Sequence, residues 1–458
     1  MEDVAKVNPI APVAIIGGGW AGCAAAVTLA AADVPVVLYE TAGVLGGRAR
    51  RVERDGLPLD NGQHLLLGAY ERTLELMTRV HGERAARAQF ARRPLSIVPF
   101  SETQSGGLTM LSRRAPGRLG LLVGLLSARG LSWRERIANL GWFRNLERGG
   151  FVRPPHETVQ KMMSPLPPRV ARLLWEPLCL AALNTPVTEA SAQVFANVLR
   201  ASFAGAGDAS DFLLPAVDLS TLFPDAAAQF VAARGGSVRL GAHAQVVKSG
   251  HDEAIFAVNG NAERAAAAIV AVGPHQLRQA FAAEALAQHP SLSAAIGALE
   301  MLAYEPIVTI WLGYAAAVAM PGPIARLDDA PGQWVLDRPD ILARAAAADH
   351  PPLAQLLAVV ISASGPHMAS PHAELARAVD AQLRRLQPAL PPCAWSQVIA
   401  EKRATYACTP QRPRPSGPRF APGIYLAGDY VDTEYPATLE AAVRSGIATA
   451  EALLVDRH

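Results

Sequence analysis

The segment from Val13 to Glu40 constrains the fold of this chain more than any other part of it. An apolar run, Val13 to Ile16, precedes the glycine-rich run Gly17 to Gly22, and an alanine-rich stretch then leads to a second apolar run, Val36 to Tyr39. Short apolar runs on either side of a helix are typical of buried parallel strands. The order of these pieces predicts a strand–turn–helix–strand unit with a dinucleotide-binding turn.

Three glycines of this turn have separate physical roles. Gly17 permits the tight turn, Gly19 lets the backbone approach a pyrophosphate, and Gly22 lets the helix pack closely on the strand. The amides and the positive dipole at the helix start then hold the anion. Glu40 ends the second strand, where its carboxylate is placed to accept hydrogen bonds from the ribose hydroxyls of an adenosine. No Arg adjoins Glu40 to meet a 2′-phosphate, which argues against NADP.

A glycine pair followed by an arginine, Gly46-Gly47-Arg48, comes six residues after the acid. Gly47 brings a second backbone segment to the same pyrophosphate, and Arg48 adds a guanidinium. This arrangement is typical of flavoproteins. The N-terminal region therefore favours FAD over NAD.

Composition excludes several classes of protein. The net charge is near +2 and 18% of the residues are charged, which gives no sign of a nucleic-acid surface or of disorder. The length of 458 residues predicts two domains. The cysteines lie far apart without a C-x-x-C pair, so we expect reduced thiols and neither a zinc ribbon nor any other metal site. They are Cys23, Cys179, Cys393 and Cys408.

The chain shows no sign of secretion or of a membrane span. Met1 to Pro12 lacks the long apolar core of a secretion signal, and no stretch reaches the ~20 apolar residues that cross a bilayer. We therefore expect a cytoplasmic protein that is soluble or bound to a membrane surface.

Strand and helix patterns alternate at both ends of the chain and are interrupted in the middle. This predicts an α/β protein in which a Rossmann-type FAD-binding domain, residues 1–85, 224–285 and 396–458, interleaves with a mixed α+β substrate domain, residues 86–223 and 286–395. A turn is expected at Leu57–His64. Helices are expected at Tyr70–Val80, Trp133–Leu146, Thr158–Met163 and Arg169–Leu174, and strands at Ser237–Leu240, Ala244–Val247, Ala266–Val272, Tyr304–Leu312 and Leu356–Ile361.

The C-terminal region supplies the second half of the predicted cofactor site. A strand ends on Gly428 and Asp429, and a helix starts near Thr438 and Leu439. Asp429 would reach the ribityl or pyrophosphate region, and the amides near Thr438 would face N1 and the C2 carbonyl of the flavin. The alternative is a plain turn with Thr438 as the helix N-cap. Val247, in the returning strand, is the remaining predicted cofactor-binding residue.

Several blocks together resemble the hydroxysqualene dehydroxylases, the squalene-associated FAD-dependent branch of the amine oxidase and phytoene desaturase superfamily. Glu434 and Ala441 depart from the family pattern, where glycines are usual, and this puts the shape of the pocket near Tyr435 in doubt. The matching blocks are Gly17–Arg48, Asp60–His64, Trp175–Thr185, Gly332–Trp334, Lys402–Thr405 and Ala427–Gly446.

The resemblance implies reductive removal of the allylic hydroxyl of hydroxysqualene to give squalene, in hopanoid biosynthesis. An acid would help the hydroxyl leave, and reduced flavin N5 would deliver hydride. Electrons would come from a soluble nicotinamide or a partner reductase, and the isoprenoid substrate from an upstream squalene-synthase-like enzyme. The alternatives are a polyene desaturase, an amine oxidase with Tyr430 or Tyr435 beside the amine, and a non-enzymatic lipid-escort protein.

The proton donor is predicted among three residues. His64 follows a glycine turn and titrates near neutral pH, Glu176 lies in an apolar block where burial would keep it protonated, and Tyr435 flanks the expected flavin. Asp60 would instead bond a backbone turn. Trp175 and Trp334 would serve as core or as a wall of the substrate pocket.

The stretch from Arg118 to Arg129 is apolar at its centre and basic on both flanks. Because a C30 hydrocarbon is insoluble, we expect this stretch to be a helix that dips into a membrane leaflet, with the arginines at the headgroups. The alternative is an ordinary buried helix. The arginines concerned are Arg114, Arg118, Arg129, Arg134 and Arg136.

Overall fold

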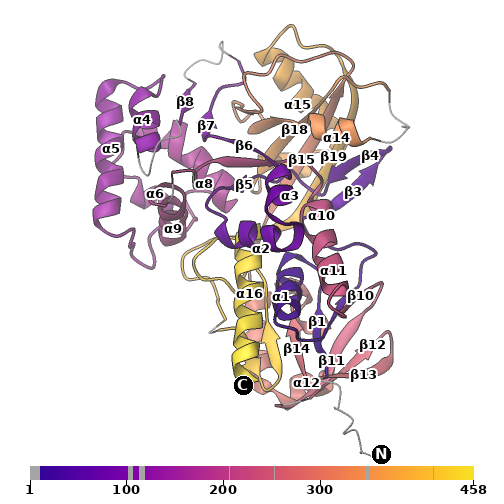
Figure 1. Ribbon diagram of the computed structural model, residues 1–458. Coiled ribbons are helices and arrows are strands. Elements are labelled where there is room, and N and C mark those ends of the chain that lie inside the picture. The colour runs from indigo at the N-terminus through magenta and orange to yellow at the C-terminus, as the bar shows by residue number, and fades with distance from the viewer. Residues whose placement is uncertain are drawn as a thin grey trace, which may run out of the picture.

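The computed structural model of the protein describes residues 11–101, 107–112, 119–205, 207–251, 253–345, 351–415 and 417–457. Figure 1 shows a lower region that holds the C-terminal helix, a six-stranded sheet and a small three-stranded sheet, and an upper region with a five-stranded sheet and a group of helices to one side. This arrangement confirms the α/β class with a Rossmann-type domain.

A six-stranded sheet forms the lower region. Its first five strands are parallel, and the last is antiparallel. Because its strands come from three separate parts of the chain, the middle of the chain is free to form the upper region. The order is β10 (Ser237–Leu240), β2 (Val36–Glu40), β1 (Val13–Ile16), β14 (Ala267–Val270), β21 (Ile424–Leu426) and β20 (Arg419–Ala421).

The first and last long helices pack against each other beside this sheet. A Cβ on Gly446 of α16 (Leu439–Asp456) would lie 2.2 Å from the carbonyl oxygen of Ala21 in α1 (Trp20–Ala31), so the close approach of the two helices requires glycine there. Four other helices pack on this pair: one contacts α16 and another contacts α1, and each of these two has a short helix beside it. They are α2 (Glu71–His81), α3 (Glu83–Ala88), α10 (Leu219–Leu222) and α11 (Pro224–Ala232).

A separate three-stranded antiparallel sheet lies between β10 and β14 in the sequence. It contains the predicted strand Ala244–Val247, which therefore does not extend the six-stranded sheet. The three strands are β11 (Ala244–Ser249), β12 (Ala254–Val258) and β13 (Asn261–Ala265). The short helices η2 (Pro274–Gln276), η3 (Arg278–Ala280), α12 (Ala283–Gln288) and α13 (Pro290–Glu300) follow β14.

An antiparallel five-stranded sheet forms the upper region. Successive side chains of a strand point to opposite faces of the sheet. One face of this sheet packs against α15 (His372–Leu386) in a hydrophobic core, and the other face lines a cavity. The order is β16 (Ile324–Arg326), β17 (Trp334–Asp337), β18 (Gln355–Ser362), β15 (Tyr304–Tyr314) and β19 (Cys393–Tyr406); α14 (Pro339–Arg344) and η4 (Pro366–Ala369) lie between β17 and α15 in the sequence.

Two sequence expectations change in this fold. The domain boundary predicted at residue 396 falls inside β19, which pairs with β15 along most of its length. Leu57–Asp60, expected as part of a turn, is strand β4 and pairs with β3 (Arg51–Arg54), so the turn is confined to residues 61–64. The reason is burial: Leu57 and Leu59 alternate into the core, which outweighs the turn tendency of Pro58.

The predicted helices of the middle segment are present, and the prolines at 165, 167 and 168 separate them. Trp175 is buried there, with its ring 5.1 Å from that of Trp142, so it belongs to the core. The helices are α4 (Leu119–Ser127), α5 (Trp133–Arg148), α6 (Val159–Met162), α7 (Pro168–Val170), the π-helix η1 (Ala171–Trp175), α8 (Glu176–Leu183) and α9 (Ala192–Phe203).

Short strands join this helical group to the rest of the upper region. One set is ordered β5 (Leu66–Leu67), β9 (Phe212–Pro215) and β6 (Phe90–Arg93), and the other pairs β7 (Ser96–Ile97) with β8 (Met110–Leu111). Within the described ranges, no helix combines the length and the apolar content needed to cross a membrane.

Candidate active site

The glycine turn after β1 forms the floor of a cavity of about 1190 Å³ that runs between the two regions. Gly17 has a φ of +109°, which favours glycine. Gly19 is the N-cap of α1 and has no capping side chain, so the helix amides stay available to an anion. A Cβ on Gly19 would meet nothing within 4 Å, whereas one on Gly22 would lie 2.0 Å from the carbonyl oxygen of Gly17. The open space at Gly19 and the close packing at Gly22 support a turn that lets a pyrophosphate approach, and the cofactor-binding roles of these glycines stay a prediction.

Glu40 holds the turn in place. Its carboxylate accepts hydrogen bonds from the amides of Gly18 and Ala42, each at 2.7 Å, and the residue also lines the cavity. The acid therefore fixes the backbone of the turn and is within reach of a ligand in the cavity.

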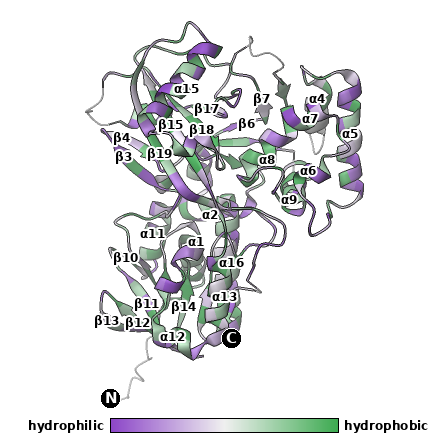
Figure 2. Ribbon diagram, turned by 180° about the vertical axis from the view of Figure 1, so that it is seen from behind, coloured by the Kyte–Doolittle hydropathy of each residue, from purple (hydrophilic) through white to green (hydrophobic). Residues whose placement is uncertain are grey.

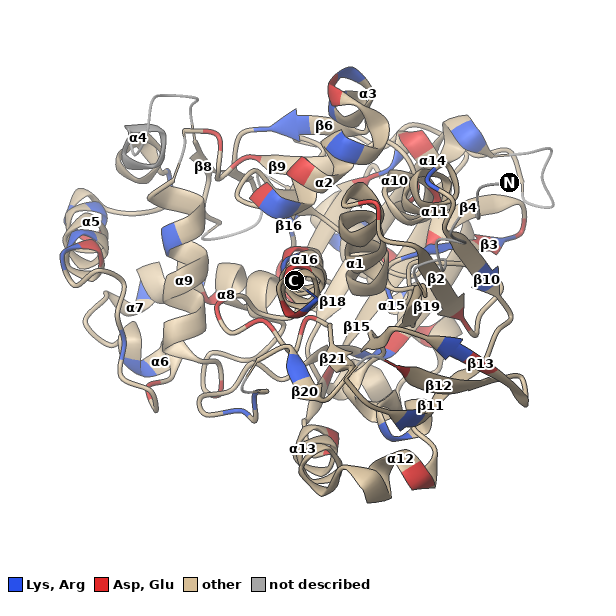
Figure 3. Ribbon diagram, turned by 60° about the horizontal axis from the view of Figure 1, so that its bottom comes forward, with Lys and Arg blue, Asp and Glu red and all other residues tan. Residues whose placement is uncertain are grey.

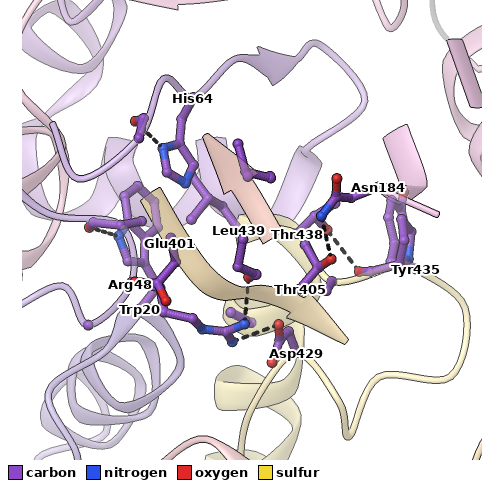
Figure 4. A pocket seen from close by; sticks show the side chains of 18 of the residues that line it. Trp20, Arg48, His64, Asn184, Glu401, Thr405, Asp429, Tyr435, Thr438 and Leu439 are labelled. Atoms are coloured by element: carbon purple, nitrogen blue, oxygen red, sulfur yellow. Dashed lines mark hydrogen bonds and ion pairs between the residues drawn. The ribbon is translucent and has the colours of Figure 1, made fainter. Parts of the chain in front are cut away.

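Arg48 joins the two halves of the site. Its Nη2 lies 2.8 Å from Oδ2 of Asp429, and its Nη1 donates to the carbonyl oxygen of Ala404, as Figure 4 shows. Gly46 and Gly47 both have positive φ, which turns the chain so that Arg48 faces this contact. Asp429 is buried, so its charge requires the guanidinium. Both residues line the cavity.

The start of α16 closes the other side. Thr438 is its N-cap and accepts a hydrogen bond from the amide of Ala441, and both Thr438 and Leu439 line the cavity. The two interpretations of Thr438 are therefore compatible: it caps the helix and stands at the cavity wall. Gly428, also in the wall, donates its amide to Ser445.

The residues of the cavity fit FAD. The open space at Gly19, the uncapped amides of α1 and the Arg48 cation suit a pyrophosphate, and the start of α16 suits an anionic ring edge. Tyr430 lines the same cavity, and its buried hydroxyl has no hydrogen-bond partner among the described residues, which indicates a ligand beside it.

Val247 is a correction to the predicted cofactor site. It lies in β11, and the cavity is lined instead by residues that follow β14, from Ala271 to Gln276. The physical reason is that β11 belongs to the separate three-stranded sheet, which does not reach the cavity floor.

His64 lines the cavity, but its protonation state differs from the one expected. Nδ1 lies 2.8 Å from the carbonyl oxygen of Gly62. A carbonyl only accepts, so Nδ1 carries the proton and Nε2 of the neutral ring is an acceptor. Burial lowers the pKa of His64 below its usual value, and the charges of Arg338 and Arg48 lower it further. A neutral His64 is therefore a hydrogen-bond acceptor at pH 7, and the predicted acid role does not fit.

Glu176 is also a correction. Leu178, Ala181 and Ala182 are the α8 residues that line the cavity. Glu176 precedes Leu178 by two positions, which is about 200° around a helix, so it lies on another face. It is half-buried on that face and is not among the residues that line the cavity.

Tyr435 lines the cavity as predicted. Its ring lies 4.9 Å from the guanidinium carbon of Arg444, and Asp432 accepts a hydrogen bond from its amide. Burial raises the pKa of Tyr435 to about 12, so the phenol keeps its proton at neutral pH. Asp60, by contrast, is buried and accepts from the amide of Leu219, which agrees with the structural role expected for it.

An apolar arm extends the cavity away from the glycine turn. Helices α8 and α9 supply most of it, and Trp334 of β17 also lines the cavity. Among the described residues that these two helices place in the wall, none carries a charge. These residues are all apolar except Ser202; they are Leu178, Ala181, Ala182, Phe195, Val198, Leu199, Ala201, Ser202 and Phe203.

Sequence reasoning missed several residues of the wall. Asn184 has a φ of +47° and bonds three other segments, and Gln63 and Tyr304 also line the cavity. An Asn after a helix is a known signal for a left-handed C-terminal position and would have found Asn184. No local pattern marks Tyr304, because only the pairing of β15 with β19 brings it to the site.

A Rossmann-type cradle facing a sheet across one cavity defines an FAD-dependent oxidoreductase. Residues 20–454 match the family described as flavin containing amine oxidoreductase, and the chain belongs to this family.

Two curated relatives are similar over almost their whole length. The hydroxysqualene dehydroxylase of Rhodopseudomonas palustris is 28% identical over 96% of this chain and 98% of its own. The hydroxysqualene dehydroxylase of Sinorhizobium fredii is 27% identical, and the match covers 97% of this chain and 99% of that protein.

Solved structures show the same fold. An oxidoreductase from Methanosarcina mazei has a TM-score of 0.70 at 15% identity, covering 96% of this chain and 100% of its own. Cyclohexylamine oxidase from Brevibacterium oxydans has a TM-score of 0.67 at 16% identity, and the match covers 98% of this chain and 100% of that structure.

Proposed function

We propose that the protein removes the allylic hydroxyl of hydroxysqualene reductively to give squalene. The observation that carries this proposal is the uncharged, apolar arm of α8 and α9, which opens from the same cavity as the FAD cradle. Burial of a long hydrocarbon there is favourable by about 25 cal/mol per Å² of apolar surface removed from water. The names of the two curated relatives agree with this substrate.

The charges of the wall favour an alcohol over an amine. The acids among its described residues are Glu40, Asp429 and Glu401, and the first two bond the cradle itself. Glu401 accepts from Asn61. A cationic amine in the apolar arm would therefore lack a carboxylate partner, which is costly in a buried site. Amine oxidation remains the alternative, together with polyene desaturation.

The chain's own groups orient the hydroxyl and help it leave. Reduced FAD supplies the hydride equivalent when bound. Nε2 of neutral His64 accepts a hydrogen bond from the substrate hydroxyl, and the phenol of Tyr435 is the proton donor to the departing oxygen. The apolar arm keeps water away from the allylic carbon while charge develops there.

The test is an anaerobic incubation of dithionite-reduced protein with hydroxysqualene, followed by mass spectrometry. We expect squalene to form and the flavin to reoxidise. His64→Ala should remain yellow and lose most of its turnover, because FAD binding does not need this ring. If the reduced flavin is not reoxidised by hydroxysqualene, while the oxidised flavin of the same protein is reduced by an amine or by a polyene that it desaturates, the proposal is wrong.

The pH dependence follows from the lowered pKa of His64. Above that pKa the ring is neutral and Nε2 accepts; as the pH falls through it, Nε2 becomes a donor. We therefore expect kcat/KM to fall at acid pH, with a midpoint below 6.5. A profile with no acid limb in wild type would argue against His64 as the acceptor.

We also propose that the protein collects its insoluble substrate at a membrane surface. Four apolar side chains are exposed where the end of α4 meets the first turns of α5: Val123, Leu126, Trp133 and Ile137. Figure 2 shows hydrophilic and hydrophobic residues alternating along α5, and Figure 3 shows α4 and α5 at one edge of the molecule.

Basic side chains surround this apolar group. Arg136 donates to the carbonyl oxygen of Leu126 and so joins the two helices, and the guanidinium of Arg134 lies 5.9 Å from the Trp133 ring. Arg129 is exposed nearby. Arginine with exposed tryptophan is typical of surfaces that bind anionic lipid headgroups. Arg114, Arg118 and the Leu122 side chain lie outside the described residues.

Flotation with phosphatidylglycerol vesicles tests the membrane proposal. We expect wild type to float and Trp133→Glu/Ile137→Glu to lose most of its binding, because two charges would enter the interface. Met301→Glu, which replaces an exposed apolar residue that follows α13, is the control and should float like wild type. Equal flotation of all three proteins, or none by wild type, would remove this proposal.

The partners predicted from the resemblance stay proposals. A single dinucleotide fingerprint in the sequence supports an external source of electrons, either a soluble nicotinamide or a partner reductase. Transfer of hydroxysqualene from an upstream squalene-synthase-like enzyme would complete the supply of substrate.

A further inference from the structure

A chain of alternating arginines and aspartates links three elements that lie far apart in the sequence. Arg51 of β3 lies 3.2 Å from Asp218, which lies 3.3 Å from Arg344. Arg344 and Arg338 both contact Asp340 of α14, at 3.1 and 2.8 Å. The network therefore ties β3, α10 and α14 together.

Arg338 is the buried end of this network. Its side chain is 2% exposed, and its Nε and Nη2 bond both oxygens of Asp340. Nη2 also lies 3.5 Å from Oδ2 of buried Asp60. Burying ion pairs rarely adds stability over an apolar core of the same shape, so stability alone does not account for Arg338. Its planar guanidinium does hold several acceptors in fixed directions.

The remaining donor of Arg338 reaches the cavity wall. Nη1 donates to Oε1 of Gln63, which fixes the orientation of that amide. Nε2 of Gln63 consequently donates to the carbonyl oxygen of His64 at 2.7 Å, and the backbone amide of Gln63 donates to Thr309 of β15. Both Gln63 and His64 line the cavity.

The same segment sets the tautomer of His64. Its Nδ1 bonds the carbonyl oxygen of Gly62, which lies in the turn that Gln63 holds against β15. If Gln63 lost its partner, this short turn would relax and the ring would be free to rotate or to change tautomer.

We propose that Arg338 is a positioning residue, which acts through Gln63 to hold residues 61–64 so that Nε2 of His64 faces the cavity as an acceptor. This inference rests on the proposed function for its turnover readout. Its structural readout, the tautomer of His64, does not depend on the substrate.

Gln63→Leu and Arg338→Met test the proposal, singly and together, in the FAD-bound protein. Each single variant should lower kcat for hydroxysqualene about tenfold with little change in KM, because misplacement of a catalytic group slows the chemical step. The double variant should be no slower than the worse single variant, since Arg338 acts through Gln63. Effects that multiply in the double variant would overturn the proposal.

Nitrogen-15 NMR of the histidine rings, with His64 assigned by His64→Ala, gives the second readout. Wild type should show Nδ1 protonated in His64, and Gln63→Leu and Arg338→Met should show a mixture of tautomers. The pKa of His64 should rise in Arg338→Met, because the charge of Arg338 lowers this pKa in wild type. In the variant only the charge of Arg48 still lowers it.

Arg344→Met is the matched control. It removes an arginine of the same network that does not contact Gln63, and it should keep both kcat and the His64 tautomer. If Arg338→Met fails to fold, Gln63→Leu decides alone: an unchanged tautomer and kcat in that variant would refute the inference. If the variants change the tautomer of His64 but wild type forms no squalene, the positioning role is upheld and the proposed substrate is refuted.

Discussion

We expect Gly19→Val to give a folded protein that no longer retains FAD. A Cβ at this position meets nothing within 4 Å in the protein, and the φ of −71° at Gly19 suits any residue, so the fold has no reason to change. The new side chain would instead occupy the space in front of the α1 amides, where the pyrophosphate binds. The purified variant should be colourless, with FAD affinity lowered by about a hundredfold or more.

Gly22→Ala separates a blocked cofactor from a damaged fold. Its Cβ would lie 2.0 Å from the carbonyl oxygen of Gly17, so the helix and the turn must move apart. We expect this variant to lose both FAD and stability. Circular dichroism and thermal melting should compare each variant with wild type stripped of flavin, because bound FAD itself stabilises the fold. A yellow Gly19→Val protein would place the cofactor elsewhere.

Asn184→Leu should lower the free energy of unfolding by about 4 kcal/mol. Asn184 is buried after α8, where Nδ2 donates to Thr405 and Pro306 and Oδ1 accepts from the amide of Ala363. The side chain therefore joins the helical group to β15, to β19 and to the residue that follows β18; Figure 4 shows the contact with Thr405 of β19. Leucine would leave these buried groups without partners.

The backbone of Asn184 allows the two contributions to be separated. Its φ of +47° costs a leucine about 1–2 kcal/mol but costs glycine nothing. Asn184→Gly should thus be less destabilising than Asn184→Leu. Asn145→Leu, on the exposed side of α5, should change stability by less than about 0.5 kcal/mol. Urea unfolding with saturating FAD measures all three; an Asn184→Leu protein as stable as the control would contradict this account.

The cradle was predictable because its physics is local. Gly17, Gly19 and Gly22 act through backbone geometry within one turn, and Glu40 bonds amides only a few ångströms from its own strand. The start of α16 at Thr438 was predictable for the same reason. Leu57–Asp60 shows the limit, because burial against the core decided its conformation.

The candidate catalytic residues were less predictable because their chemistry depends on distant neighbours. The ordinary pKa of histidine predicts that His64 is an acid, but burial and the charges of Arg338 and Arg48 lower its pKa in the fold. Glu176 lies in α8, which lines the cavity, but on a face that does not line it. Val247 lies in the three-stranded sheet and not in the six-stranded sheet. Arg338 is 275 residues from Gln63 in the sequence and touches it in the fold.

The sequence by itself determined the Rossmann-type unit, the FAD cradle and the place of the second cofactor segment, because each has a short residue pattern of its own: an apolar strand, a glycine turn or a capped helix start. Only the tertiary structure decided which side chains face the cavity, how Arg48 meets Asp429, and whether His64 carries a second proton. These properties depend on burial and on charges from remote segments, and no local pattern of residues encodes them.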